Sequence, residues 1–130
     1  MNAPLGMQRL WFATGLLMLL LIAVVSLIPI DQPLPIRGAD KFEHVLAYFV
    51  LMYWWGMVQP GRLWGWLLFL PLFGLALELL QGLTPHRFME WRDAAANTAG
   101  ALLGLVILKT PAARLLGVLD TKLGNRINTG

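Results

Sequence analysis

The segment from Leu10 to Ile28 contains no charged residue. A helix needs about 20 apolar residues to cross the hydrocarbon core of a bilayer, and this segment is long enough. A secretory signal is the alternative, but its apolar core spans about 7–15 residues and ends at a small-x-small cleavage site. The run here is longer, and Val25-Ser26-Leu27 is a poor cleavage site. The segment therefore predicts a membrane-spanning helix.

The composition agrees with a chain surrounded by lipid. Hydrophobic residues make up 58% of the sequence and charged residues 13%, whereas soluble domains carry about 25% charged residues. The formal net charge is +3, and the basic residues lie mostly at the ends of apolar segments, which indicates membrane topology and not nucleic-acid binding. There is no cysteine, so disulfides and thiol chemistry are excluded.

Proline, glycine and charged residues divide the chain into four apolar segments, which predict an all-α polytopic bundle. The predicted spans lie near residues 10–28, 42–58, 63–81 and 93–108, within a transmembrane domain of residues 1–110. Residues 111–130 form a cytoplasmic tail or an interfacial helix. One helical face of this tail is apolar, which is typical of a helix lying on a membrane surface; its residues are Leu115, Leu116, Leu119, Leu123 and Ile127. A frayed tail from Leu123 onward is the alternative.

Several residues mark the expected helix ends. We expect Asp40 to cap the second helix and Asp93 the fourth, because a carboxylate accepts hydrogen bonds from the free amides of a first turn. Tryptophans are enriched at membrane–water interfaces, so Trp11, Trp64 and Trp91 are interpreted as interfacial residues.

Four spans place both termini on one side of the membrane. Most of the basic residues lie on that side: Arg9, Arg62, Lys109, Arg114, Lys122 and Arg126. Only Arg37, Lys41, Arg87 and Arg92 lie on the other. The positive-inside rule then predicts cytoplasmic termini, in a bacterial inner membrane.

This topology brings polar residues from three helices to the same outer face. They are Asp40, Lys41 and His44 from the second helix, Glu78 and Gln81 from the third, and Asp93 and Asn97 from the fourth. A carboxylate that faces lipid is costly, so we expect these groups to turn inward and form one polar pocket. Arg87, and with it Arg92, would close the pocket from the third loop.

Each of these residues has two interpretations. Glu78 is a proton carrier or substrate-binding carboxylate, or it is an ion-pair partner that ties helices together. His44 is a general base oriented by a carboxylate, or a hydrogen-bonded packing residue. Arg87 and Arg92 bind an anionic group or anchor the loop beside aromatic side chains. For Asp93 and Asn97, capping and interhelical hydrogen bonding are the favoured roles.

Several chemistries lack their usual motifs. The two histidines, His44 and His86, are not in HxxxH or HExxH spacing, so the sequence predicts no metal site. There is no GxSxG motif and no glycine-rich phosphate loop, which argues against covalent catalysis and a bound cofactor.

Small residues recur every four positions at Ala96, Gly100 and Gly104. Such a row lets another helix approach closely in lipid. We therefore expect Gly100 and Gly104 to pack against a helix of this chain or of a homo-oligomer.

The combined motif is Asp40-Lys41-x-x-His44, Glu78-x-x-Gln81, Arg87 and Asp93-x-x-x-Asn97-x-x-Gly100-x-x-x-Gly104. It resembles the VanZ-like family of small membrane proteins over about residues 30–108. The resemblance implies a cell-envelope role, and the family's namesake is associated with resistance to the glycopeptide teicoplanin.

We therefore expect the polar pocket to bind a lipid head group or an amphipathic molecule. The alternatives are a membrane-embedded acid–base enzyme acting on a lipid-linked substrate, and a structural accessory subunit of an envelope complex.

Overall fold

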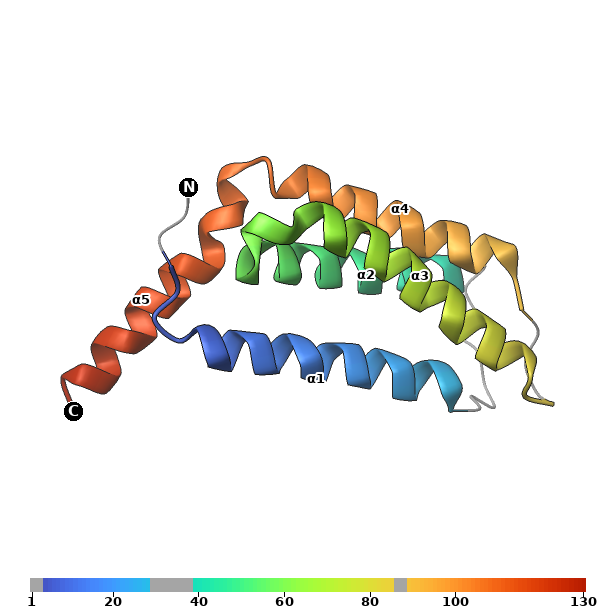
Figure 1. Ribbon diagram of the computed structural model, residues 1–130, viewed down its shortest axis with the longest axis horizontal. Helices are drawn as coiled ribbons and strands as arrows, with labels where there is room; N and C mark the ends of the chain where they lie inside the picture. Colours follow the sequence, from blue (N-terminus) through green and yellow to red (C-terminus); the bar gives the residue numbers. More distant parts are fainter. Residues whose placement is uncertain (1–3, 29–38, 86–88) are drawn as a thin grey trace.

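The computed structural model describes residues 4–28, 39–85 and 89–130 (Figure 1). These residues form five α-helices and two short 3-10 turns, with no strand among them. In chain order they are α1 (Gln8–Leu27), α2 (Ala39–Val58), η1 (Pro60–Arg62), α3 (Leu63–Gly82), α4 (Trp91–Ile107), η2 (Pro111–Arg114) and α5 (Leu115–Asn128). The first four helices lie within a few residues of the four segments expected from the sequence.

Helices α1 to α4 run alternately up and down the long axis of the molecule (Figure 1). The end of α1, the start of α2, the end of α3 and the start of α4 therefore meet at one end, which we call the loop end. Both termini and α5 lie at the other end, the termini end. Helix α2 packs against α1, α3 and α4, so it is the central helix of the bundle.

Two glycines allow α4 to lie directly on α2. A Cβ at Gly100 would lie 2.3 Å from the backbone oxygen of Val45, and one at Gly104 would lie 2.7 Å from the Cβ of Met52. The small-residue row thus packs on α2 within one chain. An oligomer formed through this row would have to displace α2, and the oligomeric state stays a prediction.

The apolar core lies toward the termini half of the bundle and is rich in aromatic rings. Trp55 of α2 is fully buried and stacks on Trp66 of α3 with 4.0 Å between ring centroids. Helix α1 reaches this core through Gly15, whose Cα lies against the Trp55 ring, and through Trp11. Trp11 is only 8% exposed, so its interpretation as an interfacial residue is wrong, whereas Trp64 and Trp91 are exposed.

Two helical segments are long and apolar enough to cross a membrane, namely Gln8–Leu27 and Pro60–Gly82. The segments Trp91–Ile107 and Pro111–Asn128 meet at a bend of 84°. If this bent pair is counted as one segment, it is a third candidate span. The structure therefore supports two or three of the four expected spans. Helix α4 has 17 residues, and α2 carries a charged first turn. A helix enclosed by others needs less apolar surface than one that faces lipid.

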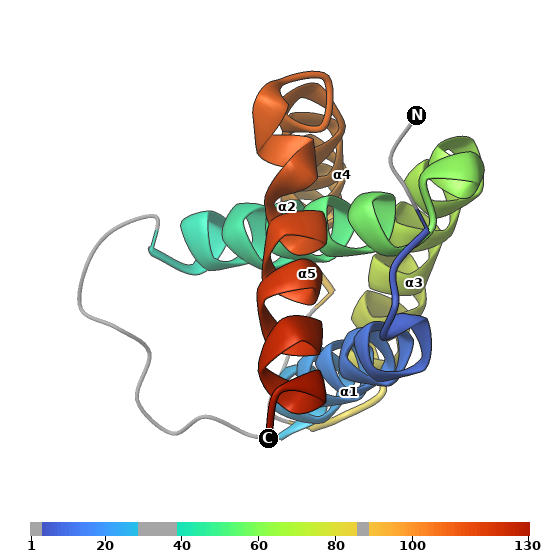
Figure 2. The same cartoon turned by 90° about the vertical axis from the view of Figure 1, so that its left-hand side faces the viewer.

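Helix α5 crosses the termini end of the bundle, as Figure 2 shows in red. Its Asp120 is buried and accepts three hydrogen bonds from the start of the chain. The donors are the amides of Gly6 at 2.7 Å and Met7 at 2.9 Å, and the indole of Trp11 at 2.7 Å. This contact explains the burial of Trp11. Of the predicted apolar face of α5, only Leu116 is buried, so the remaining leucines are exposed and a position on the membrane surface stays a prediction.

Candidate functional site

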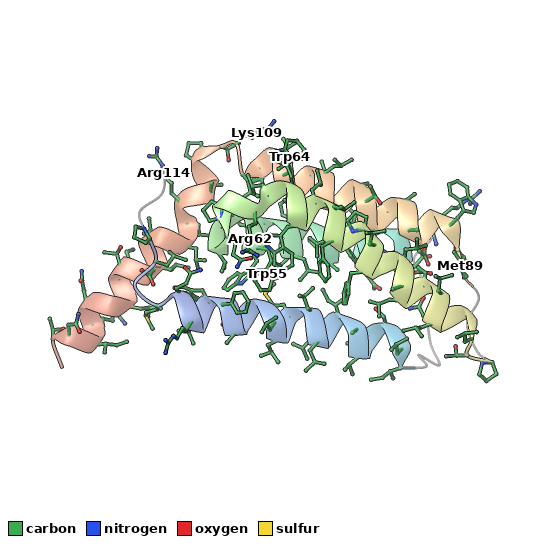
Figure 3. All side chains as sticks on the ribbon, viewed as in Figure 1. Trp55, Arg62, Trp64, Met89, Lys109 and Arg114 are labelled. Atoms are coloured by element: carbon green, nitrogen blue, oxygen red, sulfur yellow. The ribbon has the colours of Figure 1, made fainter. Side chains whose placement is uncertain are left out.

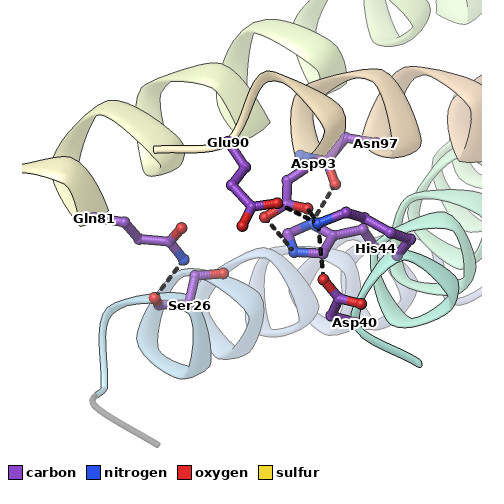
Figure 4. A network of polar contacts seen from close by, with 8 residues as sticks. Ser26, Asp40, His44, Gln81, Glu90, Asp93 and Asn97 are labelled. Carbon is purple, nitrogen blue, oxygen red and sulfur yellow. Dashed lines mark hydrogen bonds and ion pairs between the residues drawn. The ribbon is translucent and has the colours of Figure 1, made fainter. Parts of the chain in front are cut away.

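Helices α2, α3 and α4 bring seven of the eight predicted site residues to the loop end. Figure 4 shows most of them, together with the end of α1. Arg87 is the eighth and lies outside the described residues, as does His86. Neither predicted cap is one: α2 already begins at Ala39, and Asp93 follows a cap at Glu90. The Asp93 carboxylate is used in contacts with Lys41 and His44 of α2, and the Asp40 carboxylate pairs with its neighbour Lys41.

Lys41 is the centre of an ion-pair cluster. Its ammonium lies 2.7 Å from Asp40 and 2.6 Å from Glu90, and it also donates to Asp93 of α4. Burial alone would lower the pKa of Lys41, but the hydrogen bonds to the three carboxylates outweigh it and raise that pKa above its ordinary value. Lys41 therefore stays charged and ties the start of α2 to the start of α4. No motif in the sequence indicated Glu90, because its role depends on the start of α4 lying beside the start of α2.

His44 of α2 is held by α4. Its Nδ1 lies 2.7 Å from Asn97 Oδ1, and its Nε2 lies 3.7 Å from Asp93 Oδ2. An amide oxygen only accepts hydrogen bonds, so Nδ1 must donate. The imidazole is thus fixed in orientation, with Nε2 facing carboxylate oxygens.

Glu78 of α3 is the most deeply buried ionisable group of the site. It is 1% exposed, although it lies near the end of the helix. Its Oε2 has no hydrogen-bond partner among the described residues. Gln81, one turn later, is used differently: its amide donates to the backbone oxygen of Ser26 at 2.6 Å and joins α3 to the end of α1 (Figure 4).

The site contains a set of groups with metal-ligand chemistry. His44, Glu78 and Asp93 each offer a ligand atom, and the three atoms lie within 4.8 Å of one another. They come from three different helices, which is why no spacing in the sequence indicated them. A second set, of Asp40, Glu90 and Asp93, surrounds the Lys41 ammonium.

A cavity of about 650 Å³ lies at the opposite end of the bundle. It is bounded by the start of the chain, the α2–η1 junction and α5, with Arg114 and Lys122 at its edge and Asp120 in its wall. Figure 3 shows Arg114 near the junction of η2 and α5. The cavity is remote from the polar residues that the sequence singled out.

The polar set and the helix order together agree with a comparison against protein families. The family model described as VanZ/LLP1 matches residues 4–115. The chain belongs to this family. No curated protein and no solved structure matches it significantly. As a VanZ/LLP1 member with two or three helices apolar enough to span a membrane, it is a membrane protein, and the family resemblance expected from its motifs is confirmed.

Proposed function

We propose that this VanZ/LLP1 protein binds the polar head of an envelope amphiphile at the site between α2, α3 and α4. One observation carries the proposal: Glu78 Oε2 is buried without a hydrogen-bond partner among the described residues. A buried acceptor that lacks a donor costs about 1–3 kcal/mol. An occupant that donates a hydrogen bond or carries positive charge would remove this cost.

The position of the site supports such an occupant. Three helices meet at the loop end, and His44 and Asp93 are only partly buried, so a head group can reach them from one membrane face. Lys41 is committed to three carboxylates. The site therefore favours hydroxyl or amine groups of a head group over a bare anionic group.

The proposal includes the setting of the site. The protein lies in a bacterial inner membrane with both termini cytoplasmic and the loop end outward. Helices α2 and α4 cross the membrane within the bundle and complete four spans. The alternating direction of α1 to α4 supports this arrangement (Figure 1). We also propose a link to glycopeptide susceptibility, which the teicoplanin sensitivity of a deletion strain would test.

The direct test is equilibrium binding to purified protein in detergent. The probes are short-chain phosphatidylethanolamine, short-chain phosphatidylglycerol and teicoplanin. We expect saturable binding of at least one probe, weakened at least tenfold by Glu78→Gln. Asp40→Asn is the matched control, because Asp40 is exposed and contacts only Lys41 among these groups. Absence of saturable binding to all three probes would contradict the proposal.

A membrane-embedded acid–base enzyme is the second candidate, and the His44 geometry favours it. The imidazole is oriented by Asn97 through Nδ1, which leaves Nε2, on the side of Asp93, as the nitrogen that can accept a proton, as a general base requires. An altered pool of lipid-linked intermediates in cells that carry His44→Gln would support this function. An unchanged pool would leave binding as the better description.

A further inference from the structure

Two acidic groups at the loop end share Asp93 but differ in what they surround. The first group contains Asp40, Glu90 and Asp93, and the Lys41 ammonium lies among them. The second contains His44, Glu78 and Asp93. No lysine or arginine in the described part of the chain pairs with Glu78, and the Lys41 ammonium reaches the second group at Asp93.

His44 has the arrangement of a metal ligand. Its Nδ1 donates to Asn97 Oδ1 at 2.7 Å, which leaves the lone pair of the neutral imidazole on Nε2. Histidines that bind metals usually donate their other ring N–H to an oxygen acceptor, and this contact fixes the tautomer and the ring orientation. The free Nε2 faces Asp93 Oδ2 at 3.7 Å.

Glu78 supplies an independent observation that points to a ligand. Its side chain is 1% exposed, and its Oε2 has no hydrogen-bond partner among the described residues. A buried carboxylate is costly unless a hydrogen-bond donor or a cation lies beside it. The Glu78 ligand atom lies within 4.8 Å of the ligand atoms of both His44 and Asp93.

We propose that His44, Glu78 and Asp93 bind one divalent first-row metal ion. Zinc–ligand distances of about 2.0–2.2 Å place neighbouring ligands roughly 3.3–3.6 Å apart, so the three side chains need to close only slightly. One imidazole nitrogen and two carboxylates suit Zn²⁺ or Mn²⁺ better than Mg²⁺, which prefers oxygen ligands and retained water. Three protein ligands leave at least one position open.

The metal site deepens the proposed function and rests on the same residues. A hydroxyl oxygen of a head group would occupy the open position on the ion. The ion itself would bind without any lipid, so the two proposals can fail separately. The sequence predicted no metal because it contains no HxxxH or HExxH motif; ligands from three helices leave no such motif.

The test uses the full-length protein without a polyhistidine tag, purified in detergent and stripped with a chelator. Zn²⁺ alone is titrated in competition with a chromophoric chelator, and bound zinc is counted by elemental analysis. We expect one zinc per chain in wild type and at least tenfold weaker binding in both Glu78→Gln and His44→Gln. Asp40→Asn is the control, and it should bind zinc as wild type does.

Folding of each variant is checked by circular dichroism in the same detergent. If Glu78→Gln is unfolded, the zinc affinity of His44→Gln is compared with that of wild type instead. Less than stoichiometric zinc in wild type, or equal affinity in wild type and in the folded ligand variants, would overturn the metal site. Zinc binding without head-group binding would support it and refute the proposed function, whereas head-group binding by a protein that binds no zinc would refute the metal site alone.

Discussion

Each end of the bundle contains a buried carboxylate, but the two are bound very differently. At the termini end, Asp120 accepts hydrogen bonds from two amides and an indole. At the loop end, Glu78 is buried more deeply, yet one of its oxygens has no partner among the described residues. Asp120 therefore behaves as a structural group that holds α5 to the start of the chain. Glu78 resembles a group whose partner is a ligand.

The largest expected effect is at Asp120. Asp120→Ala removes three hydrogen bonds to a charged acceptor, each worth about 1.5–3 kcal/mol when measured singly. Because such values are not additive, we expect a loss of about 3 kcal/mol in the free energy of unfolding, measured by denaturation in detergent. Trp11→Phe removes one donor and should cost about 1.5–3 kcal/mol. If Asp120→Ala left the free energy of unfolding unchanged, Asp120 would not be a structural group and the contrast between the two ends would be wrong.

The next effect tests the contact that builds the loop-end site. Gly100→Ala would place a Cβ 2.3 Å from the Val45 backbone oxygen, so α4 must move away from α2. Overpacking of this kind costs about 1–3 kcal/mol, and we expect about 2 kcal/mol in the same measurement. Gly65→Ala in α3 is the control. Its Cβ would meet nothing within 4 Å, so the helix should gain stability. Equal effects would disprove close packing at Gly100.

Glu78→Gln should change stability less, and in the opposite direction to Asp120→Ala. The substitution keeps the shape and removes a charge that lacks full compensation. We expect unchanged stability or a gain of about 1 kcal/mol, as is usual when a residue is kept for function at a cost to stability. A large fall in melting temperature would instead make Glu78 a structural ion-pair or hydrogen-bond partner.

The smallest effect concerns Asp40. Its hydrogen bond to Lys41 holds the pKa of Asp40 below its ordinary value. Its contribution is therefore present above the ordinary pKa of an aspartate and is lost as the pH falls through the lowered value. Because Asp40 is 62% exposed, we expect Asp40→Asn to cost only about 0.3 kcal/mol at neutral pH. Comparison of wild type and Asp40→Asn across acidic pH would show the difference disappear, and a difference that grew on acidification would contradict this sign.

Helix positions and the meeting of polar groups could be predicted from the sequence, because long apolar runs and alternating direction determine both. The family could be predicted from the motif residues. The roles of residues that depend on a distant contact partner could not be predicted as well from the sequence. Asp93 was expected to cap α4, yet its carboxylate contacts Lys41 and His44 and so links α4 to α2. Asp120 had no apparent role, because its donors lie more than 100 positions earlier in the chain. The metal-ligand set was missed because its members come from separate helices.

The uneven burial of the helices has a consequence for how the chain enters the bilayer. Helix α1 has no charged residue after Arg9 and buries only Trp11 and Gly15, so it can enter lipid without partners. Helix α2 begins with a charged turn whose Lys41 pairs with Glu90 and Asp93 only when the start of α4 is in place, and α4 follows α2 in the chain. Membrane insertion and bundle assembly are therefore separate events for this chain: α1 anchors it early, and the centre of the bundle forms only after translation has passed α4.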